Sequence, residues 1–597
     1  MDSGIPDWHA GVMEQSGAPV DPAAHPLLAR IRDSVIGDDH VMTTPYGRRL
    51  VTYADYTASG RALSFLEDVI RDHVLPAYAN THTMSSGTGL QTTRLREDAR
   101  EIIRRAVQGD DDTIVLFTGA GATAAIDKLI GILGLRIPSA LEDRWHVTDH
   151  IPADQRPVVF IGPYEHHSNE IPWRETIADV VVIAQDADGG VCLTDLETQL
   201  AAYAARPLKI GSFSAASNVT GIVSDTAAIA ALLHAHGALS FWDYAAAGPY
   251  VEISMTAPAD GEPTAYKDAV FLSPHKFIGG PSTPGVLVAR RELFANRVPD
   301  VPGGGTVRFV NADAHSFLDD PVEREEGGTP AIVDSIRAGL VFQLKEAVGV
   351  ETIRACEERL LRRAVSAWQG EPGLEILGNL ERERLSIVSF TVRGRSRAYL
   401  HHNFVVALLN DLFGIQARGG CSCAGPYGHR LLGIDGAHSH ALERSILGGC
   451  GGIKPGWVRV NFNYFVSDAV ADYVIEAVRM IARDGWRLLG DYLYDPATGR
   501  WRHRRGAVEP PLRLTDFAYA ADGRLTLPHG LGASAAESGS RLDPERMLRD
   551  HVAEAAAILA AAVAPDLVGG ADALAAVGPD FDELRFFDLP ASSLLPT

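Results

Sequence analysis

Six short apolar runs, most of them followed by a helical stretch, constrain the fold of this chain more than any other feature. The runs are rich in valine, isoleucine and phenylalanine, and they have the length of buried strands. They are TIVLF (113–117), PVVFIG (157–162), DVVVIA (179–184), LKIGSFS (208–214), ALSFWD (238–243) and DAVFLS (268–273). A seventh run, GVLVAR (285–290), follows closely enough to be a hairpin partner. Buried strands that alternate with helices predict an α/β fold, with a mostly parallel sheet covered on both faces.

The chain is too long for one compact core, so we expect two lobes and an extension. After the large sheet, a long helical stretch is predicted over about 331–369. The run LSIVSFTV (385–392), a helix near 405–412, VRVNFNY (458–464) and a helix over 468–484 then predict a smaller α+β lobe. The expected parts are an irregular N-terminal arm (1–45), a large domain (46–345), a small domain (346–487) and an extension of unknown role (488–597), with an Ala-rich helix near 547–563.

Charge and cysteine usage narrow the possible partners and the compartment. The formal net charge of −22 disfavours nucleic acids and anionic membranes as main partners, although a local basic pocket remains compatible with it. The first residues lack the apolar core and basic start of a secretory signal, and the apolar stretch 555–564 is too short to span a bilayer. Five cysteines without a signal indicate reduced thiols and a cytoplasmic protein.

Four polar segments follow the predicted strands: TGAGATAA (118–125), the EHHSN loop (165–169), Asp243 and SPHK (273–276). Because functional residues gather at the carboxyl ends of strands in open α/β sheets, we expect these segments to meet. The Gly-rich turn before a helix offers backbone N–H groups and a favourable dipole to a phosphate. It also imitates a dinucleotide fingerprint, but the acidic residue expected about 20 positions later is not evident. An ordinary strand–helix turn is the third interpretation.

Lys276, Asp243 and the two histidines of EHHSN carry the chemistry that we expect at this edge. A lysine in an apolar pocket has a lowered pKa and suits Schiff-base formation. Asp243 could pair with a pyridinium nitrogen, and His166 or His167 could stack on an aromatic ring. Taken singly, each has a plainer interpretation: a solvated lysine, a helix N-cap and hydrogen-bonded loop histidines. Their combination favours a cofactor site.

Together these residues resemble the class V aminotransferase family of fold-type I enzymes that use pyridoxal 5′-phosphate (PLP), especially its cysteine desulfurase and selenocysteine lyase branch. The resemblance covers about residues 50–485. It rests on ADYTASG, YANTHTMSS, GPYEHHSNEIPWRE, SNVTGIVSD, SPHKFIGGPSTPGVL, EREEGGTPAI and ARGGCSCAGP, of which the EHHSN segment is the most specific. The fold implied is a large, mostly parallel sheet domain with a smaller α+β domain.

The resemblance assigns roles at the matching positions. Lys276 would bind the cofactor as a Schiff base, Asp243 would bond its pyridine nitrogen and His166 would stack on its ring. Ala122, Thr123, Ser273 and His275 would hold its phosphate, and Thr329 would reach the phosphate of a partner subunit in a homodimer. Asn218 would lie beside the ring hydroxyl or the substrate carboxylate, and Arg459 and Arg418 would clamp that carboxylate. No metal is implied.

The cysteine loop implies the reaction. Counted from Arg418, the family spacing R-x-G-x-x-C reaches Cys423 and leaves Cys421 as an extra thiol, and we expect Gly419 and Gly420 to let the loop swing. Arg418 would favour the reactive thiolate. The resemblance therefore implies removal of sulfur or selenium from cysteine or selenocysteine, giving alanine and a persulfide on Cys423. A possible sulfur-acceptor protein would then take the sulfur.

The sequence departs from the family pattern at two places, and two alternative functions remain open. Ala246 replaces a glutamine that is common in the family, and GPYGHRLLGI (425–434), with the long segment after it, resembles the PLP domain of molybdenum cofactor sulfurases.

An aminotransferase, epimerase or carbon–sulfur lyase of the same fold is one alternative. A zinc-binding module is the other, although its spacing is irregular. Its ligands would come from Cys421, Cys423, His429, His438, His440 and Cys450.

Overall fold

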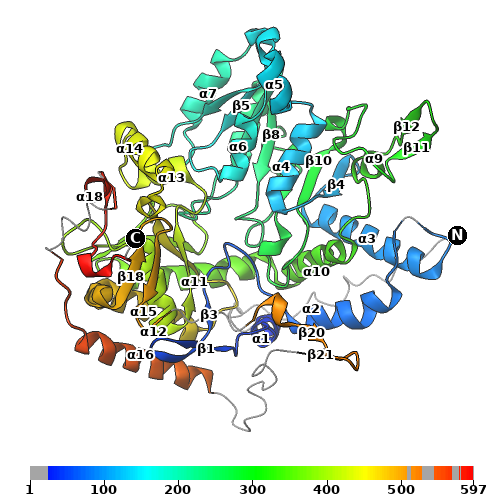
Figure 1. Ribbon diagram of the computed structural model, residues 1–597. Helices are drawn as coiled ribbons and strands as arrows, with labels where there is room; N and C mark the ends of the chain where they lie inside the picture. The colour runs from blue at the N-terminus through cyan, green and yellow to red at the C-terminus, as the bar shows by residue number, and fades with distance from the viewer. Residues whose placement is uncertain are drawn as a thin grey trace.

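A seven-stranded sheet forms the larger domain of the computed structural model, which describes residues 25–81, 83–506, 512–526, 543–567, 577–578 and 580–595. The strand order is β4-β10-β9-β8-β7-β5-β6, and only β10 runs antiparallel to its neighbours. The strands are β4 (Thr113–Phe117), β5 (Val158–Ile161), β6 (Asp179–Val182), β7 (Lys209–Ser214), β8 (Leu239–Asp243), β9 (Ala269–Leu272) and β10 (Val286–Arg290). All seven predicted runs are strands, and the predicted fold class is confirmed (Figure 1).

Both faces of this sheet are buried, because the apolar side chains along each strand point alternately to one face and the other. Ile114 and Leu116 of β4 belong to the core on the side of helix α4 (Gly121–Ile132). Val115 belongs to the core on the other face, which includes side chains of α3 (Gly87–Ala106) and α10 (Ile332–Val348). Successive side chains of a strand point to opposite faces, so a strand apolar at every position needs cover on both sides. Helices α7 (Leu193–Ala202) and α8 (Thr226–Ala235) also pack against this sheet.

The helical stretch expected over 331–369 is confirmed, but it consists of two helices. Helix α10 ends at Val348, and α11 (Val350–Trp368) begins one residue later. Gly349 between them has φ +83°, a conformation that glycine adopts without a steric penalty and that a helix cannot contain. The apolar pattern on either side of this residue did not reveal the break.

The smaller domain has a four-stranded antiparallel sheet in the order β13-β14-β17-β16, as an α+β lobe requires. Its strands are β13 (Leu374–Ile376), β14 (Ile387–Val392), β16 (Arg418–Gly420) and β17 (Trp457–Asn461). Helices α12 (His402–Phe413) and α15 (Asp468–Asp484) contribute buried apolar side chains to the same core as β14 and β17. The helix predicted over 468–484 is confirmed.

The N-terminal part of the described chain contacts both domains: Leu28 and Ile31 lie in the core of the larger domain, and the strands that follow pack against the smaller one. The segment expected to be irregular contains α1 (Pro26–Arg32) and β1 (Val41–Thr44), and β1 pairs with β2 (Gly47–Leu50). Strand β3 (Thr52–Tyr53) runs parallel to β15 (Ile415–Gln416) in the smaller domain. The described part of 25–45 is therefore structured, and residues 1–24 lie outside the described residues.

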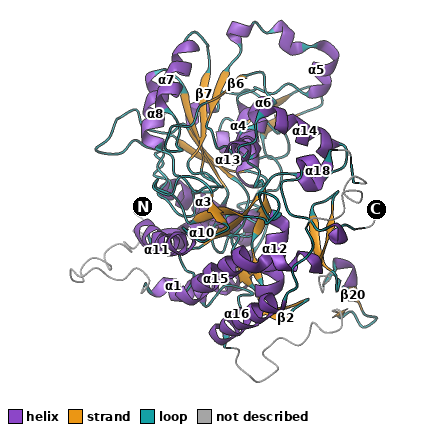
Figure 2. Cartoon of the chain, turned by 90° about the vertical axis from the view of Figure 1, so that its left-hand side faces the viewer, coloured by secondary structure: helices purple, strands orange, loops and turns teal. Residues whose placement is uncertain are grey.

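The C-terminal extension shares the core of the smaller domain. Strands β18 (Tyr492–Asp495) and β19 (Arg500–His503) form a hairpin, and the predicted Ala-rich helix is α16 (Pro544–Ala561). Tyr494, Trp501, Leu559 and Phe587 are buried in the same cluster as α12 and α15. Figure 2 shows α16 along the outside of this domain, next to α15.

No helix in the described ranges combines the length and the apolar character needed to cross a bilayer.

Candidate active site

A cavity of about 690 Å³ opens where the carboxyl ends of β4, β8 and β9 meet the smaller domain. Because these three strands run in the same direction, the polar residues that follow them reach one edge of the sheet. Eleven of the twelve predicted site residues line the cavity; Thr329 does not. The eleven are Ala122, Thr123, His166, Asn218, Asp243, Ser273, His275, Lys276, Arg418, Cys423 and Arg459.

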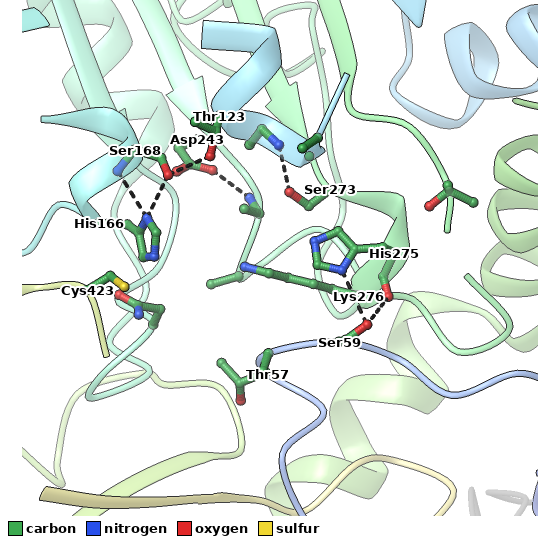
Figure 3. A pocket seen from close by; sticks show the side chains of 18 of the residues that line it. Thr57, Ser59, Thr123, His166, Ser168, Asp243, Ser273, His275, Lys276 and Cys423 are labelled. Atoms are coloured by element: carbon green, nitrogen blue, oxygen red, sulfur yellow. Dashed lines mark hydrogen bonds between the residues drawn. The ribbon is translucent and has the colours of Figure 1, made fainter. Parts of the chain in front are cut away.

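Lys276 ends the short 3₁₀ turn Pro274–Lys276 that directly follows β9. Its side chain extends across the cavity toward His166 and Cys423 (Figure 3). Burial lowers the pKa of this amine to about 8, and nearby Asp243 opposes the effect. A larger neutral fraction near neutral pH makes the amine a better nucleophile toward an aldehyde.

Asp243 ends β8 and is buried. Its Oδ1 accepts a hydrogen bond from the backbone N–H of Ala245 at 2.7 Å. Burial raises the pKa of the carboxyl, while Lys276 opposes this effect. A cation or a protonated ring nitrogen in the cavity would stabilise the ionised form of Asp243.

His166 faces the same cavity from the loop after β5. Burial lowers the pKa of its imidazole to about 3, so the ring is neutral at physiological pH. Its Nδ1 accepts the backbone N–H of Ser168 at 3.1 Å and lies 3.0 Å from the hydroxyl of that residue. These contacts hold the imidazole in place at the wall of the cavity.

The N-terminus of α4 forms an anion cradle at the edge of the cavity. Gly121 begins the helix with φ +56°, and a Cβ there would lie 2.9 Å from the hydroxyl oxygen of Ser273. That hydroxyl accepts the backbone N–H of Ala122 at 2.8 Å, and the hydroxyls of Thr123 and Ser168 lie 2.6 Å apart. A helix N-terminus with adjacent hydroxyls favours phosphate over the dinucleotide and plain-turn interpretations.

These groups fit PLP. The buried carboxylate of Asp243 suits a protonated ring nitrogen, the Lys276 amine suits an aldehyde, and the N-terminus of α4 suits a phosphate. His275 also faces this region. Burial, and then the charge of Lys276, lower the pKa of His275 to about 4, and its Nδ1 lies 3.3 Å from the hydroxyl of Ser59.

Two arginines face each other across β16 and β17, where Arg418 is the register partner of Arg459. Directly opposed residues of an antiparallel pair project to the same face, so both guanidinium groups reach the cavity. Arg459 is buried and donates to the carbonyl of Asn218 at 3.0 Å and to Oδ1 of Asp55 at 2.9 Å. Its Nε has no partner in the described chain. Burial lowers the pKa of Arg459, and Asp55 opposes that effect.

The turn that carries Cys423 is held rigidly. Ser422 and Cys423 have φ of +50° and +57°, values that residues other than glycine seldom adopt. The carbonyl of Cys423 accepts the backbone N–H of His167 at 2.8 Å, and the carbonyl of Ser422 accepts Nδ2 of Asn218 at 2.8 Å. Gly419 and Gly420 are part of β16 and pair with β17, and the expected swing of the loop stays a prediction.

The sequence interpretation missed residues from the ADYTASG segment. Thr57 and Ser59 line the cavity, and the buried hydroxyl of Thr57 has no partner among the described residues. Asp55 is the ion-pair partner of Arg459. The segment's likeness to the family motif could have indicated its position, but not these contacts. Ala246 lines the cavity where the family glutamine would stand.

The cysteines and histidines of the zinc alternative do not form a metal site. Within the part of the chain that the structure describes, no group of three or more histidine, cysteine, aspartate or glutamate side chains is placed to hold a metal ion. His429 lies 3.3 Å from the hydroxyl of Ser439, and the thiol of Cys450 lies 3.8 Å from the carbonyl of Val577.

Comparison with known proteins agrees with this geometry. The family model described as aminotransferase class-V matches residues 52–438. A cysteine desulfurase of Dickeya dadantii is 27% identical over 411 residues, which are 68% of this chain and 90% of that protein. A probable cysteine desulfurase of Halalkalibacterium halodurans is 26% identical over 380 residues, 63% of this chain and 84% of that protein.

Solved structures show the same fold. The apo cysteine desulfurase of Thermococcus onnurineus aligns with TM-score 0.59 and 22% identity, covering 76% of this chain and 97% of that one. The cysteine desulfurase CsdA of Escherichia coli aligns with TM-score 0.55 and 20% identity, covering 71% and 93%. The family model, the sheet topology and the placement of Lys276, Asp243 and the α4 cradle lead to one conclusion: this chain is a PLP-dependent enzyme of the class V aminotransferase family.

Proposed function

We propose that the chain is a cysteine desulfurase, which removes sulfur from cysteine, or selenium from selenocysteine, and releases alanine. One observation carries the proposal: the thiol-bearing Cys423 and the amine of Lys276 line the same cavity. An aminotransferase or an epimerase needs the lysine but has no use for a thiol there. The similarity to named cysteine desulfurases over most of their length supports the same activity.

Four residues of the chain have distinct roles in the proposed reaction. Bound PLP supplies an electron sink for the electrons released at the substrate Cα. Lys276 accepts the Cα proton at its Nζ. Burial lowers the pKa of this amine to about 8, which raises the fraction that is neutral and able to take a proton. The guanidinium groups of Arg459 and Arg418 orient the substrate carboxylate. The neutral imidazole of His166 covers one face of the cofactor site without adding a charge.

Cys423 completes the reaction. Its thiolate attacks the substrate sulfur, an S–S bond forms and the carbon–sulfur bond breaks. The bonding electrons stay with the substrate Cβ, which takes up one proton to become the methyl group of alanine. The sulfur stays on Cys423 as a persulfide. Asn218 and His167 hold the backbone of the turn, so its geometry is set before substrate arrives.

The direct test measures products from cysteine in the presence of a reductant. Desulfuration gives alanine and sulfide in equal amounts. Pyruvate and ammonia in place of alanine would assign the chain to the carbon–sulfur lyase alternative, and alanine formed only from pyruvate and an amino donor would assign it to the aminotransferases.

Arg459→Ala is expected to raise the KM for cysteine roughly 10- to 100-fold, because a charge-assisted hydrogen bond contributes about 1.5–3 kcal/mol. PLP absorbance should be retained, since the cofactor contacts proposed above do not include this arginine. Arg359→Ala is the matched control, because Arg359 pairs with Asp468 at the surface. A wild-type KM for Arg459→Ala in steady-state assays would remove Arg459 from the carboxylate site.

We further propose a homodimer. Thr329 is exposed and lies outside the cavity of its own chain, as a residue that reaches a partner's phosphate must. Exposed apolar side chains at Tyr78, Met84 and Leu90 lie on the segment and helix that precede β4. Such apolar surface is typical of an interface. Light scattering decides the point: twice the 64.0 kDa chain mass is expected, and a fully active 64.0 kDa species would refute the dimer.

A cytoplasmic location and a separate sulfur-acceptor protein complete the proposal. None of the five cysteines, all of which lie in the described ranges, forms a disulfide, which suits a reducing compartment. The segment after Cys423 forms α13 (Gly425–Leu431) and α14 (Gly436–Leu447). Its likeness to molybdenum cofactor sulfurases stays a prediction.

A further inference from the structure

A second cavity, of about 250 Å³, lies on the other side of the cysteine turn from the active site. We call it the outer cavity. Cys423 lines both cavities, whereas Cys421 lines only the outer one. The turn thus separates the two spaces, with one thiol that both share and a second thiol that faces outward. The reaction proposed above does not use Cys421.

One buried polar atom of a residue lining the outer cavity has no partner among the described residues. His402 is 7% exposed, lines the cavity, and its buried Nδ1 has no hydrogen-bond partner in the described chain. A Cβ on Gly456 would lie 2.9 Å from Cε1 of His402, and one on Gly419 would lie 3.2 Å from its Cδ2. The two glycines thus leave room for an imidazole held tightly beside the cysteine turn. A buried ring nitrogen without a hydrogen-bond partner costs free energy.

Positive charge also lines the outer cavity. Arg418 and Lys454 are both exposed lining residues, and none of the described residues that line the cavity with them carries a carboxylate. A small polar space lined by two cations suits an anionic sulfur species better than an apolar ligand.

We propose that Cys421 is a relay thiol, which takes the sulfur from Cys423 and presents it in the outer cavity. This inference rests on the proposed desulfurase function. The thiolate of Cys421 attacks the terminal sulfur of the Cys423 persulfide. A bond forms between the Cys421 sulfur and the terminal sulfur, the bond from Cys423 Sγ to that sulfur breaks, and Cys423 leaves as a thiolate. Cys421 gives up its thiol proton and Cys423 takes one up. One S–S bond replaces another, so nothing is oxidised or reduced overall.

The backbone favours this transfer over a disulfide. The carbonyl of Cys421 accepts the N–H of Ala424 at 3.0 Å, which closes a tight turn around Ser422 and Cys423. A disulfide between residues two apart would have to distort that turn, whereas the sulfur transfer leaves the backbone in place. Each transfer frees Cys423 for another substrate while the first sulfur waits in the outer cavity.

The test is the burst of alanine from PLP-loaded enzyme and excess cysteine without reductant. A relay gives about two alanines per subunit, because both thiols can hold one sulfur, and Cys421→Ser gives one. Cys192→Ser is the matched control and should give two, since Cys192 lies at the start of α7, outside both cavities. Fragment masses of the alkylated peptide 419–430 should place one added sulfur on each of Cys421 and Cys423 in the wild-type protein.

Two results would overturn the relay: a wild-type burst of one alanine, or two sulfurs that are both on Cys423. In either case alanine still forms, so the desulfurase proposal survives. If the wild-type protein forms no alanine from cysteine, the proposed function itself fails. The retained burst of one alanine in Cys421→Ser shows that this variant is folded and loaded.

Discussion

Lys276→Ala is expected to lower turnover at least ~10³-fold, because the change removes both the amine that holds the cofactor and the base at the substrate Cα. The fold should survive. The amine of Lys276 contributes to no hydrogen bond or ion pair in the described part of the chain, and its burial is a cost to the folded state. Circular dichroism and thermal unfolding should match the wild-type protein, while steady-state assays show the loss.

Lys267 provides the matched control for Lys276. Burial also lowers the pKa of Lys267 to about 8, but its Nζ donates to the carbonyl of Ser254 at 3.0 Å, outside the cavity. Lys267→Met should therefore keep the bound cofactor. If Lys276→Ala were as active as Lys267→Met, Lys276 would not be the lysine that binds the cofactor.

Cys423→Ser is expected to lower alanine formation from cysteine at least ~100-fold, because a hydroxyl is a much weaker nucleophile than a thiolate. Cofactor binding and the visible colour should persist, since Cys423 lies beside His166 and not at the α4 cradle (Figure 3). Cys421→Ser should keep alanine formation when an added reductant clears Cys423 directly.

Normal alanine release by Cys423→Ser would exclude desulfuration through this turn and leave the lyase alternative. A loss of activity in Cys421→Ser equal to that in Cys423→Ser, even with reductant, would mean that the family spacing had selected the wrong thiol.

The sheet could be predicted because its signal is local. Each strand of the large sheet is a short apolar run, and the residues after β8 and β9 meet because parallel strands share an edge. Lys276, Asp243 and the turn before α4 therefore came together as expected. The family motifs added the arginines and Cys423, which come from the smaller domain and which no local pattern connects to Lys276.

Contacts between distant segments could not be predicted. The ion pair between Asp55 and Arg459 joins residues 404 positions apart, and it depends on how β17 and the N-terminal segment pack. The break at Gly349 depends on a single φ angle. The aromatic side chains of the extension, such as Trp501, indicated burial but not which core they would join.

The separation of the outer cavity from the active site could not be predicted either. The sequence placed Cys421 and Cys423 two positions apart but could not show that Cys423 lines both cavities while Cys421 lines only the outer one. That separation depends on the left-handed turn at Ser422 and Cys423, and on the ring of His402, which belongs to another segment of the domain.

The central claim, that PLP is bound as a Schiff base on Lys276, is tested most directly by reducing the purified protein with borohydride and mapping the modified peptide. Reduction fixes the bond between an amine and the cofactor aldehyde. The account predicts that the visible absorbance disappears and that one cofactor mass per chain is found on the peptide that contains Lys276. A colourless protein that takes up no added PLP, or a cofactor mass on another lysine such as Lys267, would contradict it.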